Sequence, residues 1–278
     1  MSTSDHWGAQ GLITSRANAH VARVRSLRRR AERERTGLCL AEGIRAVVEA
    51  VQQGASIEEL VVAPALLRSE VALNLVARLK QQGISVIEVS AEVFESLSLR
   101  EGPQGLAAVV RQHWESLDQA DPKVGLCWVG LEGVQDPGNL GSILRTGDAV
   151  QAAGVILVGD TTDPYDPASI RASTGAVFSQ RLVRADLVEL EEWKRAYAVN
   201  AVGTSGSSLT DYRSPVYEPP LLVLMGNEQR GLSAQALALC DTTVRIPMLG
   251  RCDSLNLAVA TGVVLYEILR QRQVASRS

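Results

Sequence analysis

The sequence has few of the residues that build disulfide frameworks, metal centres and histidine-based catalytic sites. Its 278 residues include only 4 cysteines and 3 histidines. No two cysteines form the C-x-x-C pair that is typical of zinc and redox sites. Scattered cysteines favour reduced thiols in a cytoplasmic compartment, so we expect neither a disulfide framework nor a bound metal.

Long apolar runs and a leader pattern are also missing. No uninterrupted apolar stretch approaches the roughly 18 residues that a membrane-spanning helix needs. Residues 1–7 lack the positive start and apolar core of a secretory signal. The chain nevertheless contains 46% apolar residues, which is enough to bury a substantial core and excludes general disorder. We therefore expect a soluble, cytoplasmic protein without membrane association.

Charge is distributed unevenly along the chain. The formal net charge is −3, yet the stretch 16–35 holds eight arginines and two glutamates, a charge of +6 that leaves −9 for the remainder. The guanidinium group suits bidentate contact with phosphate. This block is therefore a candidate RNA-binding surface, represented by Arg28, Arg29 and Arg30. A solvated helix face is the alternative that charge alone leaves open.

Apolar periodicity predicts alternating strands and helices in both halves of the chain. After a basic helix at 15–35, the expected strands of the first half lie at 38–40, 60–63, 85–89 and 106–110, and its helices at 44–53, 71–80 and 91–97. In the second half we expect strands at 125–131, 155–158, 197–202, 221–225 and 243–246, and helices at 138–152, 168–177, 233–239 and 254–272. The continuously apolar strand at 221–225 is typical of a parallel sheet that is covered on both faces.

These elements predict an α/β protein with two domains. Residues 1–36 form a basic N-terminal segment in this interpretation, and 37–114 form the smaller α/β domain. The polar stretch 115–123 resembles a linker, and 124–278 form a larger, doubly wound α/β domain with a parallel sheet.

Three polar segments, 134–146, 226–233 and 246–256, each follow an apolar strand, which is where open α/β sheets place their ligand sites. Neither G-x-x-x-x-G-K-[ST] nor G-x-G-x-x-G fits the first segment, which argues against a P-loop protein and a nucleotide-dependent oxidoreductase. Asn139 as a helix cap and Arg145 as a surface ion pair are the plain structural alternatives, and Ser254 is expected to cap the last helix.

In this order and spacing, the three segments together resemble the motifs of the SpoU (TrmH-type) ribose 2′-O-methyltransferases of the SPOUT class. D-P-G-N-L-G at 136–141 is similar to the first motif, G-N-E at 226–228 to the second, and I-P-M at 246–248 with S-L-N-L-A-V-A at 254–260 to the third. The first half resembles the substrate-binding domain of several rRNA-modifying members, through E-G-I-R at 42–45 and P-Q-G at 103–105.

The resemblance implies a C-terminal SPOUT-type domain with a trefoil knot, S-adenosylmethionine as the cofactor, and a homodimer. It implies methylation of a ribose 2′-hydroxyl in RNA, and the N-terminal domain favours 23S rRNA as the substrate. In these terms 37–114 is the RNA-binding domain and 124–278 is the methyltransferase domain. A tRNA ribose 2′-O-methyltransferase and a catalytically silent RNA-binding homologue remain as alternatives.

The resemblance also assigns site residues by position. The cofactor-binding positions are Thr204, Gly226, Ile246 and Leu255. The catalytic-site positions are Asn139, Arg145, Glu228, Ser254 and Asn256. Because none of the three histidines, His6, His20 and His113, lies in a motif, we do not expect a histidine base. Arg145 is open to two roles, base or phosphate anchor; a guanidinium gives up a proton reluctantly, which makes the anchor physically easier.

Overall fold

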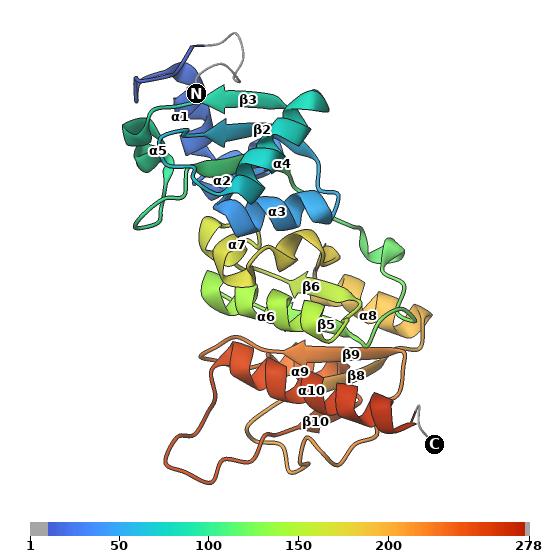
Figure 1. The fold of residues 1–278 in the computed structure, drawn as a ribbon. Helices are drawn as coiled ribbons and strands as arrows, with labels where there is room; N and C mark the ends of the chain where they lie inside the picture. The colour runs from blue at the N-terminus through green and yellow to red at the C-terminus, as the bar shows by residue number, and fades with distance from the viewer. Residues whose placement is uncertain (1–10, 276–278) are drawn as a thin grey trace. The chain divides into compact units, whose positions relative to one another are not determined.

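A computed structural model describes residues 11–275, so His6, the expected absence of a leader and the start of the basic segment lie outside the described residues. The α/β fold that we expected is confirmed, and the chain forms two compact units (Figure 1). Unit 1 runs to Gln112 and includes Tyr165–Phe178, while unit 2 comprises His113–Pro164 and the residues from Ser179 on. None of the helices within 11–275 has the length and apolar character that crossing a membrane requires.

Unit 1 is built on a four-stranded mixed sheet. The strand order is β1-β4-β2-β3, in which β2 and β3 are parallel and β4 is antiparallel to both of its neighbours. The strands are β1 (Leu38–Glu42), β2 (Ile57–Val62), β3 (Ser85–Glu88) and β4 (Leu106–Arg111). Apolar side chains of α1 (Ala19–Ser26) and α5 (Ala91–Leu97) share a buried core with the sheet. The helix α3 (Ile44–Gln52) contacts β1 and β4, and α4 (Glu70–Gln81) contacts β3.

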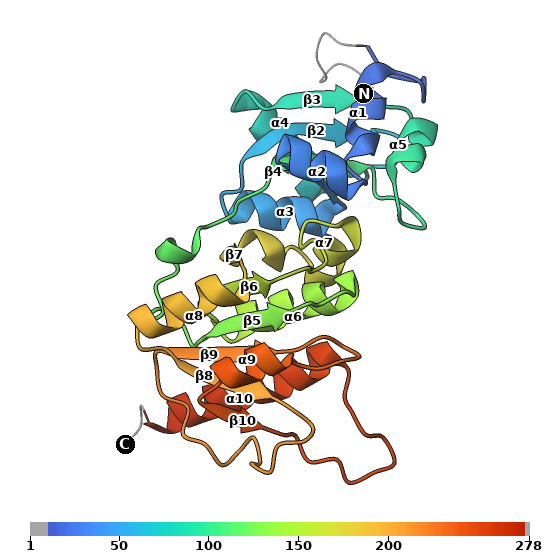
Figure 2. The ribbon, with the colours of Figure 1, turned by 180° about the vertical axis from the view of Figure 1, so that it is seen from behind.

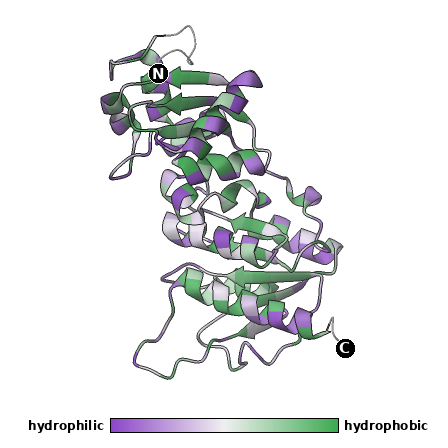
Figure 3. Cartoon of the chain, in the orientation of Figure 1, coloured by the Kyte–Doolittle hydropathy of each residue, from purple (hydrophilic) through white to green (hydrophobic). Residues whose placement is uncertain are grey.

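Unit 2 contains six parallel strands in the order β10-β8-β9-β5-β6-β7. They are β5 (Trp128–Glu132), β6 (Gly154–Val158), β7 (Leu182–Ala185), β8 (Asn200–Thr204), β9 (Leu221–Met225) and β10 (Thr242–Val244). The helices α6 (Pro137–Ala149) and α10 (Leu257–Ala275) pack together on one face (Figure 1), and α8 (Leu187–Ala196) and α9 (Ala234–Leu239) cover the other (Figure 2). Because both faces are covered, β6 and β9 are buried along their whole length and consist almost entirely of hydrophobic residues (Figure 3).

Four local predictions differ from the structure. The strand β7 and the helix α8 were not expected, because β7 is short and contains Arg184, and the apolar pattern of α8 is diluted by charge. The basic stretch 15–35 forms two helices, α1 and α2 (Arg30–Thr36), rather than one. The expectation that Ser254 caps the last helix is wrong: α10 begins at Leu257, and Asn256 Oδ1 accepts hydrogen bonds from the first-turn backbone amides.

Two segments lie in units other than those that their sequence suggested. The polar stretch 115–123, expected as a linker, packs into unit 2 through the short helix η1 (Leu117–Gln119). Trp193 Nε1 donates a hydrogen bond of 3.0 Å to the carbonyl of Ala120, which is fully buried. Conversely, α7 (Pro167–Ser173), expected within the larger domain, lies in unit 1 against β1.

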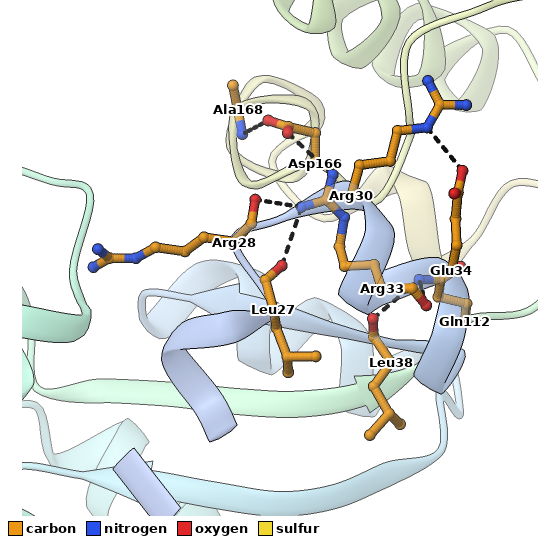
Figure 4. Close-up of polar contacts among 9 residues, drawn as sticks. All are labelled: Leu27, Arg28, Arg30, Arg33, Glu34, Leu38, Gln112, Asp166 and Ala168. Carbon is orange, nitrogen blue, oxygen red and sulfur yellow. Dashed lines mark hydrogen bonds and ion pairs between the residues drawn. The ribbon is translucent and has the colours of Figure 1, made fainter. Parts of the chain in front are cut away.

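The interruption between α1 and α2 is organised by a buried arginine. The Arg33 side chain is 1% exposed, and its Nη1 donates to the carbonyls of Leu27, at 3.0 Å, and Arg28, at 2.8 Å (Figure 4). Its Nη2 pairs with Asp166 Oδ2 at 3.2 Å, which joins the basic segment to the segment that contains α7. Arg33 therefore serves the packing of unit 1 rather than its charged surface.

We predict that Arg33→Ala destabilises unit 1 by about 3 kcal/mol, because it strips buried carbonyls and Asp166 of their partner. Thermal unfolding followed by circular dichroism measures this loss. Arg35→Ala is the matched control, since Arg35 lies on the same helix, is largely exposed and pairs only with Glu32 in the described structure. Its effect should stay within about 0.5 kcal/mol. Equal effects of the two substitutions would contradict this role of Arg33.

Candidate active site

Three loops at the carboxyl edge of the unit 2 sheet are joined by two side-chain hydrogen bonds. Asn139, in the first turn of α6, donates from Nδ2 to Glu228 Oε1 at 3.1 Å. Asn256, at the start of α10, donates from Nδ2 to Asn139 Oδ1 at 2.8 Å. Strand ends of a parallel sheet meet at one edge, so residues far apart in the sequence come together there. The structure thus brings three of the expected catalytic residues into one chain of contacts.

Glu228 is held at the N-terminus of α6. Its carboxylate accepts hydrogen bonds from the backbone amides of Asp136, at 3.2 Å, and Gln135, at 3.3 Å, in addition to the bond from Asn139. Partial burial raises the pKa of Glu228, but the hydrogen bonds from backbone amides and Asn139 outweigh this effect, so its net pKa lies below the ordinary value. Glu228 is therefore ionised at neutral pH and acts as a hydrogen-bond acceptor.

The loop that carries Glu228 is shaped by its two preceding residues. Asn227 Nδ2 donates to the Gly133 carbonyl at 2.8 Å, and its Oδ1 accepts from the amides of Gln229 and Arg230. A Cβ on Gly226 would lie 2.1 Å from the backbone carbon of Gly231, so only glycine fits this close approach.

The loops after β8, β9 and β10 enclose a cavity of about 580 Å³, which we call the loop cavity. Its size falls within the range of about 300–1,000 Å³ that is typical of small-molecule sites. All four expected cofactor-binding residues line it: Thr204, Gly226, Ile246 and Leu255. Glu228 and Ser254 also line the loop cavity, so expected catalytic and cofactor-binding positions lie around the same cavity.

Ser254 and Arg145 lie outside the chain of amide contacts. Ser254 is exposed, and its Oγ donates to Asp253 Oδ1 at 3.1 Å. Arg145 is exposed on α6, and in the part of the chain that the structure describes it forms no hydrogen bond or ion pair. The surface ion pair considered for Arg145 is therefore not formed there, and the cap of α6 is Asp136 rather than Asn139. The exposed side chains of Ser254 and Arg145 can therefore be reached by other partners.

The arginines expected to bind RNA lie in unit 1 and differ in their contacts. Arg28 Nη2 donates to the carbonyls of Ser96, at 3.0 Å, and Ser98, at 2.9 Å, and partial burial lowers the pKa of Arg28. Arg30 pairs with Glu34 at 2.8 Å, and Arg29 is exposed. The Arg28 guanidinium is therefore already hydrogen-bonded to backbone carbonyls at the end of α5, whereas the Arg29 side chain is exposed to solvent.

Sequence reasoning gave no separate role to three residues that organise the site: Gln135, Asp136 and Asn227. The signal for Asp136 was present, because an aspartate directly before a proline is a common helix start. Asn227 lies four residues before Gly231, which has a φ of +68°, a combination that is typical of a tight turn. No group of three or more His, Cys, Asp or Glu within 11–275 is placed to hold a metal ion.

Comparisons with known proteins agree with this geometry. Residues 127–266 match the SpoU rRNA Methylase family, and residues 18–108 match the MRM3-like substrate binding domain. The chain is 35% identical to the 23S rRNA (uridine(2479)-2′-O)-methyltransferase of Streptomyces viridochromogenes, over 94% of this chain and 92% of that protein. It is 30% identical to the 23S rRNA (guanosine(2553)-2′-O)-methyltransferase RlmP of Bacillus subtilis, over 92% of this chain and 98% of that protein.

Solved structures point to the same class. An S-adenosylmethionine-bound rRNA methyltransferase from Sinorhizobium meliloti is 37% identical, with a TM-score of 0.86, and the similarity covers 94% of this chain and 97% of that one. The chain belongs to the SpoU rRNA methylase family. Its N-terminal region is a substrate-binding domain of the MRM3-like type, so the resemblance seen in the sequence is confirmed in both halves.

We predict that Asn139→Ala raises the pKa of Glu228 towards its ordinary value of 4.5, because one hydrogen bond to the carboxylate is lost. Carboxyl titration by NMR measures this change. The hydrogen-bonded carboxylate stabilises the fold above pH 4.5, and this contribution disappears as the pH falls through the lowered pKa. Gln229→Ala, which removes no contact to Glu228 among the described residues, should leave the titration unchanged. A Glu228 pKa that does not respond to Asn139→Ala would refute the contact.

Proposed function

We propose that this chain transfers a methyl group from S-adenosylmethionine to a ribose 2′-hydroxyl of 23S rRNA. The observation that carries the proposal is that Glu228 and Ser254 line the same loop cavity as all four expected cofactor-binding residues. Membership of the SpoU rRNA methylase family supports the activity, and the MRM3-like domain supports rRNA over tRNA as the substrate.

The residues present fit the cofactor. The loop cavity combines apolar side chains, such as Leu232 and Leu257, with polar groups from Thr204 and Ser254, and its backbone approaches closely at Gly226. S-adenosylmethionine, when bound, supplies an electrophilic methyl group on a sulfonium. The loops after β8, β9 and β10 would hold it, largely through backbone groups, in the way that strand-end loops commonly bind small ligands.

The protein's part in the reaction is to orient the ribose hydroxyl and to allow the loss of its proton. Ser254 Oγ, on the wall of the loop cavity, orients this hydroxyl. The bonds from Asn256 to Asn139 and from Asn139 to Glu228 keep the surrounding loops in place. Arg145, exposed and without a partner within 11–275, anchors the adjacent phosphate, because a guanidinium gives up a proton reluctantly but bridges two acceptors well.

We also propose that the protein is a homodimer with a trefoil knot and that it acts in the cytoplasm. Exposed apolar side chains of the loop after β10 and of α10 support a homodimer in which a second copy covers them: Leu249, Leu255, Val259 and Tyr266. The family supports a trefoil knot in the C-terminal part of unit 2. Within residues 11–275 no disulfide joins Cys39, Cys127, Cys240 or Cys252, which supports the cytoplasm as the place of action.

We propose that unit 1 binds the RNA, with Arg29 and Arg30 contacting phosphates and Arg28 holding the chain that follows α5. Arg29→Ala with Arg30→Ala should weaken RNA binding and flatten its salt dependence, because fewer counterions are released. Filter binding across a salt series measures the slope, and cofactor affinity should be unaffected. If the slope of RNA affinity against salt concentration is unaltered, the arginine-rich stretch 16–35 is only a solvated helix face.

Gly226→Ala should lower the affinity for S-adenosylmethionine by at least about tenfold, because the new Cβ meets the backbone of Gly231 and Leu232 at 2.1 Å and displaces the loop. Isothermal calorimetry on the folded variant measures this loss. Gly262→Ala is the control, since a Cβ there meets Thr146 Cγ2 at an ordinary 3.7 Å. Unchanged affinity in the Gly226 variant would remove the loop cavity from the proposal.

The activity itself is tested by incubating the protein with methyl-labelled S-adenosylmethionine and unmodified 23S rRNA, followed by digestion to nucleosides. The label should appear in one 2′-O-methylated nucleoside. In the same assay under single-turnover conditions, Arg145→Lys should be slower by roughly 100-fold, because an ammonium cannot replace the planar, bidentate guanidinium. Saturating RNA and cofactor separate this effect from weakened binding. A near-normal rate would exclude Arg145 from the site, and the absence of label with the unaltered protein would favour a catalytically silent RNA-binding protein.

A further inference from the structure

Unit 2 contains a second cavity, of about 740 Å³, which we call the strand-end cavity. It lies outside the carboxyl ends of β5 and β6, whose last residues Glu132 and Val158 line it, and is closed by the loop after β9. The strands β6 and β7 extend the sheet to one side of β5, while β9, β8 and β10 lie on its other side. A cavity near such a reversal of strand order is where open α/β sheets usually bind their ligand. Here the expected cofactor-binding residues line a different cavity.

The two cavities share one wall. The loop 227–231 lines both of them, and Glu228 is among the shared residues. Thr204, Ile246 and Leu255 line only the loop cavity, whereas Asp136 and Asp160 line only the strand-end cavity. A ligand in the strand-end cavity would therefore lie next to the cofactor, separated from it by the loop that carries an expected catalytic residue.

Most of the polar groups that line the strand-end cavity are already occupied. Glu132 accepts from the amide of Ser233 at 2.8 Å, Asp136 accepts from the amide of Asn139, and Glu228 accepts from three donors. Two charged side chains are different. Across residues 11–275, no hydrogen bond or ion pair engages the Asp160 carboxylate or the Arg230 guanidinium. Among the charged groups that line the cavity, Asp160 thus offers an uncommitted acceptor and Arg230 an uncommitted donor.

The charge of the lining restricts the ligand. Four carboxylates, of Glu132, Asp136, Asp160 and Glu228, face one arginine, so the cavity disfavours an RNA phosphate. A nucleobase is uncharged and carries both N–H donors and carbonyl or ring-nitrogen acceptors along its edge. Enzymes that act on RNA generally read bases that have been splayed out of the stack.

We infer that the strand-end cavity binds the base of the methylated nucleotide, with Asp160 accepting from a base N–H and Arg230 donating to a base acceptor. The ribose of the same nucleotide then lies across the loop 227–231, facing Glu228 and the loop cavity. This inference rests on the proposed function. It makes Asp160 a specificity-determining residue that the motifs do not include.

Asp160 provides the cleanest test because it lines only the strand-end cavity, whereas Arg230 lines both. Asp160→Ala should raise the half-saturating concentration of an in vitro transcribed 23S rRNA in single-turnover methylation by about tenfold or more, since a hydrogen bond to a charged group is lost. Calorimetry should give an unchanged affinity for S-adenosylmethionine. Asp118→Ala is the matched control, because Asp118 is an exposed aspartate of unit 2 outside both cavities.

The direction of the effect separates the alternatives. An aspartate that only repels RNA would give the opposite result, tighter RNA binding once its charge is removed. Either that result or RNA saturation equal to that of the control overturns the inference and leaves the proposed function standing. If the unaltered protein transfers no methyl group to the RNA, the proposed function fails and the inference fails with it.

Discussion

The two amide hydrogen bonds that run from Asn256 through Asn139 to Glu228 are the constraint on which the site depends. They connect the loops after β5, β9 and β10, which are separated in sequence by almost the whole of unit 2. The backbone amides of Gln135 and Asp136 fix the far end of this chain on the Glu228 carboxylate. With these loops fixed, the loop 227–231 lines both the loop cavity and the strand-end cavity.

The motifs predicted the site residues, but not the contacts that hold them. A parallel sheet places its loops at one edge, so the meeting of Asn139, Glu228 and Asn256 followed from their positions after strands. The capping of α10 by Asn256 rather than by Ser254 depends on backbone geometry that neither composition nor periodicity encodes. The strand β7 and the helix α8 were missed because their apolar positions are few and are interspersed with charge.

The basic segment shows why charge counts alone do not define a binding surface. Of its arginines, Arg33 is buried against carbonyls and Asp166. Arg28 donates hydrogen bonds to carbonyls at the end of α5. Arg29 and Arg30 are exposed and keep their charge at the surface. The partner of Arg33 lies 133 residues further along the chain, in a segment whose sequence suggested the other domain. Only the tertiary structure could separate the structural arginines from those available to RNA.

Methylation of a ribose 2′-hydroxyl of ribosomal RNA by this chain can be measured in cells. Ribose methylation in rRNA from cells with and without the intact gene is mapped by mass spectrometry. We expect one 2′-O-methylated nucleotide of 23S rRNA to disappear with the gene and to return when the gene is restored. Identical ribose-methylation maps in the two strains, or the loss of a methyl group from a base instead of a ribose, would show that the chain does not have this activity.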